Sequence, residues 1–343
     1  MTNSIYPWQE NAWQQLQLLR QRMPHAILFY GAGGIGKSDF IERFAQSLLC
    51  EEVQADGHAC GRCASCGWFS QHNHPDYRRL RPEALEDEPP TDDEGGELDG
   101  AKKGTKSTKA PSKEIKVEQV RALADFMNMS THRHGLRLVV LYPADALNVP
   151  ASNALLKTLE EPPPNTVFLL AANKLDRLLP TILSRCRKFS LPMPTREQAL
   201  HWLEAQDVPN AEHSLCEHGG APLTAFAEAA SGDAMEGLLQ LLAHPSVEGA
   251  LKTAEKLQKA PLGALVSCLQ RWLYDLFSYK LAGIVRYYPR YLKEVAGLAE
   301  RVQLNCMMGA INRANERRAI ADHPLSPKLF IEDMLLDYAA CCA

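Results

Sequence analysis

A glycine-rich segment, Gly31–Ser38, most strongly limits the folds open to this chain. It fits the pattern G-x-x-x-x-G-K-[ST], in which glycines let successive backbone N–H groups surround phosphate oxygens. A continuous apolar run, Ala26–Tyr30, precedes it, and Asp39–Leu49 follows with apolar side chains on one helical face. A buried strand, a loop and a helix in this order predict a phosphate site and disfavour a glycine-rich turn without function. The residues expected to bind nucleotide are Gly31, Gly33, Gly34, Gly36, Lys37 and Ser38.

Strand and helix signals alternate after this loop. Short apolar runs at Leu138–Tyr142 and Val167–Ala172 predict buried strands, and amphipathic stretches at Val117–Met127 and Ser152–Glu161 predict helices. Because strands that alternate with helices pair in parallel, we expect an α/β core built on a parallel sheet. The last strand signal is Arg187–Leu191, and the pattern is helical from there to the end of the chain.

The 343 residues suffice for two or three domains of ~150 residues each. Pro192 and Pro194 mark the boundary after the last strand signal. We therefore expect an α/β core over residues 1–191, a small helical domain over 192–233 and a larger helical domain over 234–343. Helix breaks are expected in the last domain near its prolines, at Pro245, Pro261, Pro289 and Pro324.

A strongly charged segment interrupts the core at residues 83–113. Nine acidic residues and no basic ones occupy 83–100, and five lysines without an acidic residue follow in 101–113. Such a segment buries too little apolar surface to order itself. We expect a flexible surface insertion, and the alternative is an interaction tail.

Nucleotide hydrolysis needs more than a phosphate loop. It also needs acidic residues at the end of a neighbouring strand, to hold magnesium and to orient water. The strand Leu138–Leu141 ends instead in Tyr142 and Pro143, and Asp145 is displaced by three residues. We expect Asp145 to cap the next turn, and we expect nucleotide to be bound without hydrolysis.

Four cysteines, Cys50, Cys60, Cys63 and Cys66, form the clearest metal signal in the chain. Two short-spaced pairs with a fourth thiol can close a tetrahedral shell of thiolates around Zn²⁺. A closed shell leaves no position for water, so the predicted zinc is structural. Ordinary buried cysteines and iron–sulfur ligation are the alternatives.

The remaining cysteines indicate the redox environment. The chain begins without a charged segment followed by an apolar one, and no apolar run approaches the ~18 residues of a membrane span. Ten cysteines without such a signal predict a reducing cytoplasmic location and no contact with a membrane. The scattered cysteines are expected to be free thiols: Cys186, Cys216, Cys268, Cys306, Cys341 and Cys342.

Taken together, several motifs resemble one family, the bacterial clamp-loader ATPases of the AAA+ class, over about residues 5–235. Besides the four cysteines, they are Pro24–Phe29 before the phosphate loop, His74–Tyr77, Asn153–Pro163 and Ser184–Cys186. The resemblance implies an AAA+ core with a zinc module (50–66) inserted after the first helix. It also implies a helical lid (192–233) and a C-terminal helical collar domain (234–343) used for oligomerisation.

Within the family, the chain is similar to the delta-prime branch of DNA polymerase III, whose members typically lack a working ATP site. The gamma/tau branch has an acidic pair where this chain has Tyr142 and Pro143, and an arginine in the lid where it has Leu223. The resemblance implies a non-hydrolysing stator in a hetero-pentameric ring with gamma/tau and delta subunits, which loads the sliding clamp onto primed DNA. Zn²⁺ would be structural, and ATP or ADP with Mg²⁺ would be bound but not hydrolysed.

The resemblance also assigns Arg185, in Ser184–Cys186, as an arginine finger that acts in trans on a neighbouring ATPase subunit. The simpler alternative is that Arg185 pairs with a local carboxylate such as Asp176. A planar guanidinium with five donors suits a γ-phosphate, which makes the first interpretation chemically sound.

Three other functions compete with this one. An active gamma/tau-like ATPase is disfavoured because Tyr142 and Pro143 cannot bind magnesium. A zinc-dependent nucleic-acid binder would need a basic face around Cys60–Cys66, where Arg62 is the only Arg or Lys, and the net charge of −4 offers no general attraction to DNA. Catalytic polymerase activity is not expected of this chain, although it belongs to the polymerase III complex as a whole.

Overall fold

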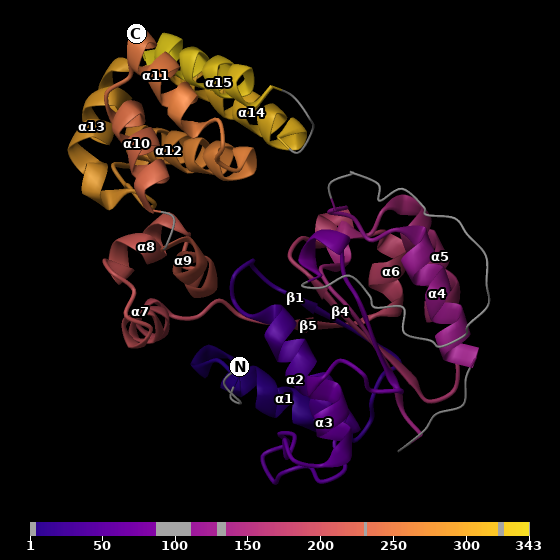
Figure 1. Ribbon diagram of the computed structural model, residues 1–343. Helices are drawn as coiled ribbons and strands as arrows, with labels where there is room; N and C mark the ends of the chain where they lie inside the picture. The colour runs from indigo at the N-terminus through magenta and orange to yellow at the C-terminus, as the bar shows by residue number, and fades with distance from the viewer. Residues whose placement is uncertain (1–4, 87–110, 129–134, 230–231, 322–325, 343) are drawn as a thin grey trace, which may run out of the picture. The chain divides into compact units, whose positions relative to one another are not determined.

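The computed structural model describes residues 5–86, 111–128, 135–229, 232–321 and 326–342 (Figure 1). The chain divides into two compact units, Met1–Met193 and Pro194–Ala343, and each is described by itself. Among the residues described, no helix combines the length and the apolar character that crossing a bilayer requires.

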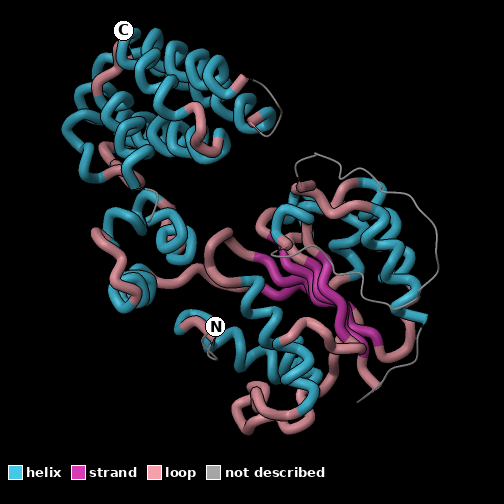
Figure 2. The backbone as a smooth tube through the Cα atoms, viewed as in Figure 1, coloured by secondary structure: helices cyan, strands magenta, loops and turns pink. Residues whose placement is uncertain are grey.

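A parallel sheet, drawn in magenta in Figure 2, forms the centre of the first unit. It has five strands in the order β2-β3-β4-β1-β5. The strand that leads into the glycine loop, β1, pairs with β4 on one side and β5 on the other. The predicted parallel α/β core is therefore confirmed. The strands are β1 (Ala26–Tyr30), β2 (Tyr77–Leu80), β3 (Arg137–Leu141), β4 (Thr166–Ala172) and β5 (Arg187–Ser190).

Helices cover both faces of this sheet, so its inner strands are apolar on both sides. Along β1, Ile27 and Phe29 belong to the hydrophobic core on one face, whereas Ala26 and Leu28 belong to the core on the other. This two-sided burial explains why the strand reads as a continuous apolar run rather than an alternating one. One face carries α1 (Glu10–Arg20), α2 (Lys37–Leu49) and α3 (Ala64–Ser70), and the other carries α4 (Val117–Asn128), α5 (Val149–Glu160) and α6 (Pro180–Arg185).

The charged segment predicted at 83–113 lies largely outside the described residues, which omit 87–110. Its two ends lie side by side. Glu83, in a short 3₁₀ turn (Glu83–Leu85), accepts a hydrogen bond from the Ser112 backbone N–H at 3.0 Å and pairs with Lys116 at 2.7 Å. The described residues on either side of 87–110 are therefore in contact.

Three short helices open the second unit and share a small core of their own. Thr195 caps the first of them by accepting a hydrogen bond from the Gln198 backbone N–H, and the Gln198 side-chain oxygen in turn accepts one from the Thr195 N–H. This reciprocal pair satisfies two of the N–H groups that a helix start leaves free. The helices are α7 (Arg196–Ala205), α8 (Ala211–Glu217) and α9 (Pro222–Glu228).

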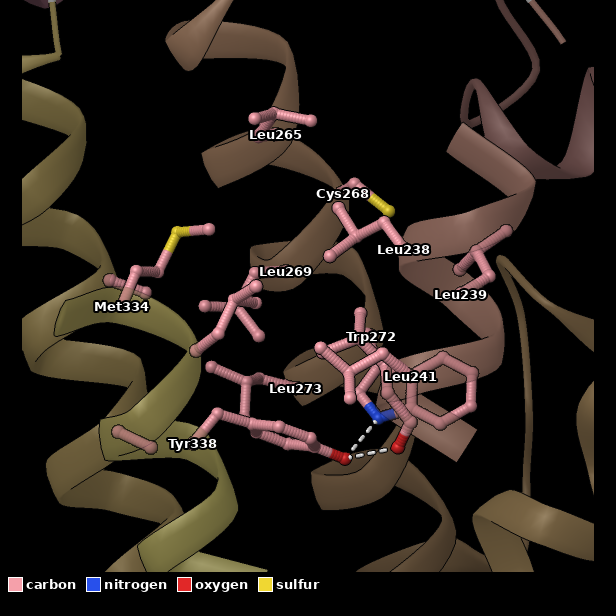
Figure 3. Packing of buried hydrophobic residues seen from close by; sticks show 14 of the residues in the cluster. Leu238, Leu239, Leu241, Leu265, Cys268, Leu269, Trp272, Leu273, Met334 and Tyr338 are labelled. Atoms are coloured by element: carbon pink, nitrogen blue, oxygen red, sulfur yellow. Dashed lines mark hydrogen bonds between the residues drawn. The ribbon is translucent and has the colours of Figure 1, made fainter. Parts of the chain in front are cut away.

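A larger helical bundle completes the second unit. At its centre the Trp272 indole N–H donates to the Tyr338 hydroxyl at 2.7 Å, and that hydroxyl donates to the Leu242 carbonyl at 2.7 Å (Figure 3). Both polar groups are thus satisfied inside an apolar core. The helices are α10 (Gly232–Ala243), α11 (Val247–Leu257), α12 (Leu262–Ala282), α13 (Leu292–Arg301), α14 (Leu304–Ile320) and α15 (Pro327–Cys342).

Prolines interrupt this bundle where the sequence predicts. Pro245 lies between α10 and α11, Pro261 precedes α12, and Pro289 begins a 3₁₀ turn before α13. The break predicted at Pro324 lies outside the described residues. Cys306 and Cys341 form a disulfide between α14 and α15, so the prediction of free thiols is wrong for this pair.

Candidate functional site

The glycine loop runs from the carboxyl end of β1 to the start of α2. Gly36 lies at the helix N-cap with φ +83°, a left-handed conformation that favours glycine. A Cβ atom on Gly31 would lie 2.5 Å from the Leu191 carbonyl oxygen, so the loop passes too close to the end of β5 for a side chain. The loop thus has the backbone geometry and the helix N-terminus that bind phosphate.

Lys37 is folded back into this loop. Its side chain is buried, and its ammonium donates a hydrogen bond to the Ala32 carbonyl. Burial lowers the pKa of Lys37 to about 8, and the negative charge of Asp145 opposes that shift. A bound phosphate would take the place of the carbonyl as a stronger partner for the ammonium.

An N-terminal segment that the sequence analysis did not single out holds the loop from outside. The Trp8 indole N–H donates to the Ile35 carbonyl at 3.0 Å, and the buried Gln9 amide donates to the carbonyls of Ile35 and Gly36 at 2.8 and 3.0 Å. These bonds fix the positions of two carbonyls of the loop. Only the unusual burial of a glutamine reveals this role, and no sequence pattern does.

The end of β3 carries no acidic pair. Tyr142 interacts there with Glu42 of α2 and with Arg81. Glu42 also accepts a hydrogen bond from the Tyr77 hydroxyl at 2.6 Å, and Arg79 lies 3.9 Å away. Burial raises the pKa of the Glu42 carboxyl, which these partners oppose. The Glu42 carboxylate is therefore already in contact with tyrosines and arginines of the same chain.

Asp145 does not cap the next turn, contrary to expectation. Its carboxylate accepts a hydrogen bond at 2.9 Å from the backbone N–H of Asn173, just after β4. The next helix, α5, is capped instead by Asn148, which accepts from the Ala151 N–H at 2.9 Å. Asp145 thereby joins the ends of β3 and β4 and brings a negative charge near Lys37.

Arg185 lies at the last residue of α6. Its guanidinium pairs with Glu160, the last residue of α5, at 2.5 Å and donates to the Thr181 carbonyl at 3.0 Å. The local partner is thus Glu160 rather than Asp176. About a third of the Arg185 side chain and half of the Glu160 side chain remain exposed. Such an exposed pair contributes ~0–1 kcal/mol, so a triphosphate would compete well for the guanidinium.

The structure brings the four predicted metal ligands together. The sulfur atoms of Cys50, Cys60, Cys63 and Cys66 all lie within 4.8 Å of one another, and those of Cys50 and Cys63 are 3.9 Å apart. Zn–S bonds of ~2.3 Å in a tetrahedron place neighbouring sulfurs roughly 3.8 Å apart. The cluster therefore has the size of a zinc site, and its thiols are the ligands that zinc prefers.

The surroundings shift the pKa values of these thiols in opposite directions. Burial raises the pKa of the Cys50 and Cys66 thiols, whereas backbone N–H groups, first that of Arg62, lower the pKa of Cys60 to about 6. A divalent cation would compensate the buried thiolates, because coordination deprotonates a thiol. The loop that joins Cys50 to Cys60 is docked on α1, where the Trp13 indole N–H donates to the Asp56 carbonyl at 3.0 Å.

The surroundings of the cluster offer little to nucleic acid. Arg62, the one basic residue between Cys60 and Cys66, pairs with Glu52 at 3.2 Å. Both side chains are largely exposed, and their charges cancel. The basic face that a zinc-dependent nucleic-acid binder would present here is therefore not formed by this segment.

Comparison with known proteins places the chain among subunits of one replication enzyme. The profile of the family described as "DNA polymerase III, delta subunit" matches residues 8–195. The DNA polymerase III subunit delta' of Pseudomonas aeruginosa is 37% identical over 86% of this chain and 82% of its own length. That of Escherichia coli is 32% identical over 71% of this chain and 67% of its own.

The tau subunit of the same polymerase is a more partial relative. The Escherichia coli tau protein is 32% identical over 63% of this chain, but the match spans 28% of tau. The similarity to the delta' proteins thus extends over far more of each relative's length than the similarity to tau.

Proposed function

Because the chain belongs to the delta-prime family of DNA polymerase III subunits, we propose that it is a non-hydrolysing subunit of the clamp loader. In this role it occupies a hetero-pentameric ring with gamma/tau and delta subunits in the cytoplasm. The ring opens the sliding clamp and closes it around primed DNA. The chain serves as a stator, against which a neighbouring ATPase subunit works.

The proposed domain roles follow the folding units. Residues 1–191 form an AAA+ core that carries the zinc module (50–66) and the charged insertion (83–113). Residues 192–233 are the lid, and 234–343 are the collar domain. Separate hydrophobic cores for α7–α9 and for α10–α15 support the division near residue 233.

One observation carries the non-hydrolysing role: an intact phosphate loop faces a strand end without an acidic pair. Gly31, Gly33, Gly34, Gly36, Lys37 and Ser38 provide backbone N–H groups, an ammonium and a hydroxyl for ATP or ADP with Mg²⁺. Tyr142 and Pro143 supply no carboxylate to hold the metal or orient water. The chain therefore binds nucleotide and leaves it intact.

The active gamma/tau-like alternative rests on Asp145, whose charge reaches Lys37. A single carboxylate, already bonded to the Asn173 N–H, does not replace an acidic pair. We expect the purified chain to show no ATP turnover above a Lys37→Ala control. Robust turnover by the wild-type chain would instead support the ATPase alternative.

Assembly tests the proposal as a whole. We expect the chain to co-purify with gamma/tau and delta, and the complex to hydrolyse ATP when the clamp and primed DNA are present. A complex that forms without this chain and loads clamps at the full rate would contradict the proposed role. Clamp loading is measured as retention of labelled clamp on circular primed DNA.

The pKa of Lys37 predicts how nucleotide affinity depends on pH. In the free chain this pKa is about 8, below the usual 10.5, so the ammonium is already charged at pH 7. As pH rises through 8, binding a triphosphate requires uptake of a proton, and affinity should fall by up to about tenfold per pH unit. Calorimetry at pH 7, 8 and 9 in buffers of different ionisation enthalpy measures both affinity and proton uptake.

Lys37→Arg is the matched control, because a guanidinium stays charged throughout this range. Its affinity should be independent of pH between 7 and 9, whatever its absolute value. An equal loss of affinity in both proteins would show that Lys37 does not control the pH dependence.

A further inference from the structure

His74 lies in the segment His74–Tyr77, between the helix that carries Cys66 and strand β2. It is buried, with 2% of its surface exposed, and so is Ser65, with 1%. The two are joined by a hydrogen bond of 2.8 Å between His74 Nε2 and Ser65 Oγ. Neither residue is among the four cysteines of the cluster, and Ser65 directly precedes Cys66.

The other hydrogen bonds of His74 and Ser65 determine which of the two side chains donates to the other. The Asp76 backbone N–H donates to His74 Nδ1 at 3.1 Å, so that nitrogen accepts and the neutral ring carries its proton on Nε2. The Ser65 hydroxyl donates its proton to the Leu49 carbonyl at 2.6 Å. Ser65 Oγ must therefore accept from His74 Nε2.

These hydrogen bonds link the two parts of the cluster that are separate in the sequence. Leu49, at the end of α2, is followed directly by Cys50, and Ser65 in α3 is followed directly by Cys66. In sequence the two cysteines are separated by the loop that contains Cys60 and Cys63. A hydrogen bond therefore joins the two residues that immediately precede these cysteines.

We propose that His74 is a positioning residue of the metal site, which orients Ser65 so that Cys50 and Cys66 are held at ligand distance. The inference rests on the zinc site that is part of the proposed function. Partners behind metal ligands commonly change metal affinity by ~10–100-fold when removed. A role through hydrogen bonding predicts that the effect depends on which polar atom is kept, not on side-chain size alone.

The experiment measures zinc release from the full-length chain to a chromogenic chelator in excess. His74→Leu and Ser65→Ala should each release zinc about tenfold faster or more, and the double variant should be no faster than His74→Leu. His74→Gln keeps a donor at the ε position and should recover most of the retention. His74→Asn keeps polarity only at the δ position and should release as fast as His74→Leu.

Ser70→Ala is the matched control, because Ser70 lies on the same helix and its hydroxyl donates to the Gly67 carbonyl of that helix at 2.8 Å. It should release zinc at the wild-type rate. The spectrum of the Co²⁺-substituted proteins gives a second readout, since a loosened Cys50 weakens the thiolate-to-cobalt bands.

The outcomes distinguish the existence of the metal site from the role of His74 in it. A wild-type chain without zinc would overturn the metal site and this inference together. A zinc-loaded chain whose Gln and Asn variants release metal at equal rates would overturn the role of His74 and leave the metal site standing. If His74→Leu fails to fold, the comparison of Gln with Asn still decides.

Discussion

Arg185→Ala is expected to leave the clamp loader assembled and to slow its ATP hydrolysis and clamp loading. An arginine supplied in trans to a γ-phosphate contributes ~10³–10⁵ in rate at the site it serves. The loader has several sites, so its total ATPase rate should fall to what the remaining sites sustain. Steady-state ATPase and clamp loading by the reconstituted complex measure the loss.

The local contacts of Arg185 predict that folding survives its removal. Its pair with Glu160 is partly exposed and contributes ~0–1 kcal/mol, which corresponds to a change in Tm of at most about 4 °C. Arg185→Lys should restore little activity, because an ammonium does not reproduce the fork of the guanidinium. Zinc content should be unchanged.

Two control variants separate a trans role from a local one. Arg187→Ala removes an exposed arginine two residues away, on β5, and should hydrolyse ATP at the wild-type rate. Glu160→Gln weakens the local ion pair but keeps Arg185, and the loader should stay active. An assembled Arg185→Ala loader with the wild-type ATPase rate would show that Arg185 is not a finger.

Loss of one cluster cysteine is the second large effect. We expect one zinc per chain, and Cys63→Ser should abolish it and destabilise the core unit. Structural zinc in small modules contributes ~10–16 kcal/mol of apparent binding energy, and this energy is coupled to folding. Because the module is also docked on α1, we expect a smaller but still large loss of about 4 kcal/mol, or ~10 °C in Tm.

Metal analysis and thermal unfolding of the purified chain, under reducing conditions without chelator, test this prediction. Cys216→Ser is the matched control, since Cys216 is a free thiol of α8 outside the cluster. It should keep both the zinc and the wild-type Tm. Wild-type protein without metal under these conditions would contradict the zinc site.

Local sequence was enough to predict features whose chemistry is encoded in short spacings. The segment Gly31–Ser38 follows β1 and runs into the first turn of α2 because the glycines, the apolar run and the helical face are contiguous in the chain. The four thiols are similarly confined by a short segment, and the structure brings their sulfurs together. Strand β1 was predictable because both its faces are buried, which makes its sequence uniformly apolar.

One edge strand of mixed composition, β2, was not predicted from the sequence. Strand β2, Tyr77–Leu80, contains two arginines, and it joins the sheet because it pairs in register with β3. Tyr77 and Arg79 of this strand then contact Glu42 of α2, and Tyr77 and Glu42 are 35 positions apart in the sequence. No periodicity in a four-residue segment predicts such a partner.

Side-chain partners were decided by the tertiary structure alone. Asp145 bonds to the Asn173 N–H because the parallel strands β3 and β4 end at the same edge of the sheet, and Arg185 pairs with Glu160 because α5 and α6 pack together. From local sequence we expected a turn cap for the first, and Asp176 was the local partner considered as the alternative to a role in trans for the second. The sequence by itself determined which chemical groups are present. It also determined which of them lie close together because they are close in the sequence. The crossing connections of the sheet decided which of those groups meet, since these contacts depend on strand order, which no local pattern records.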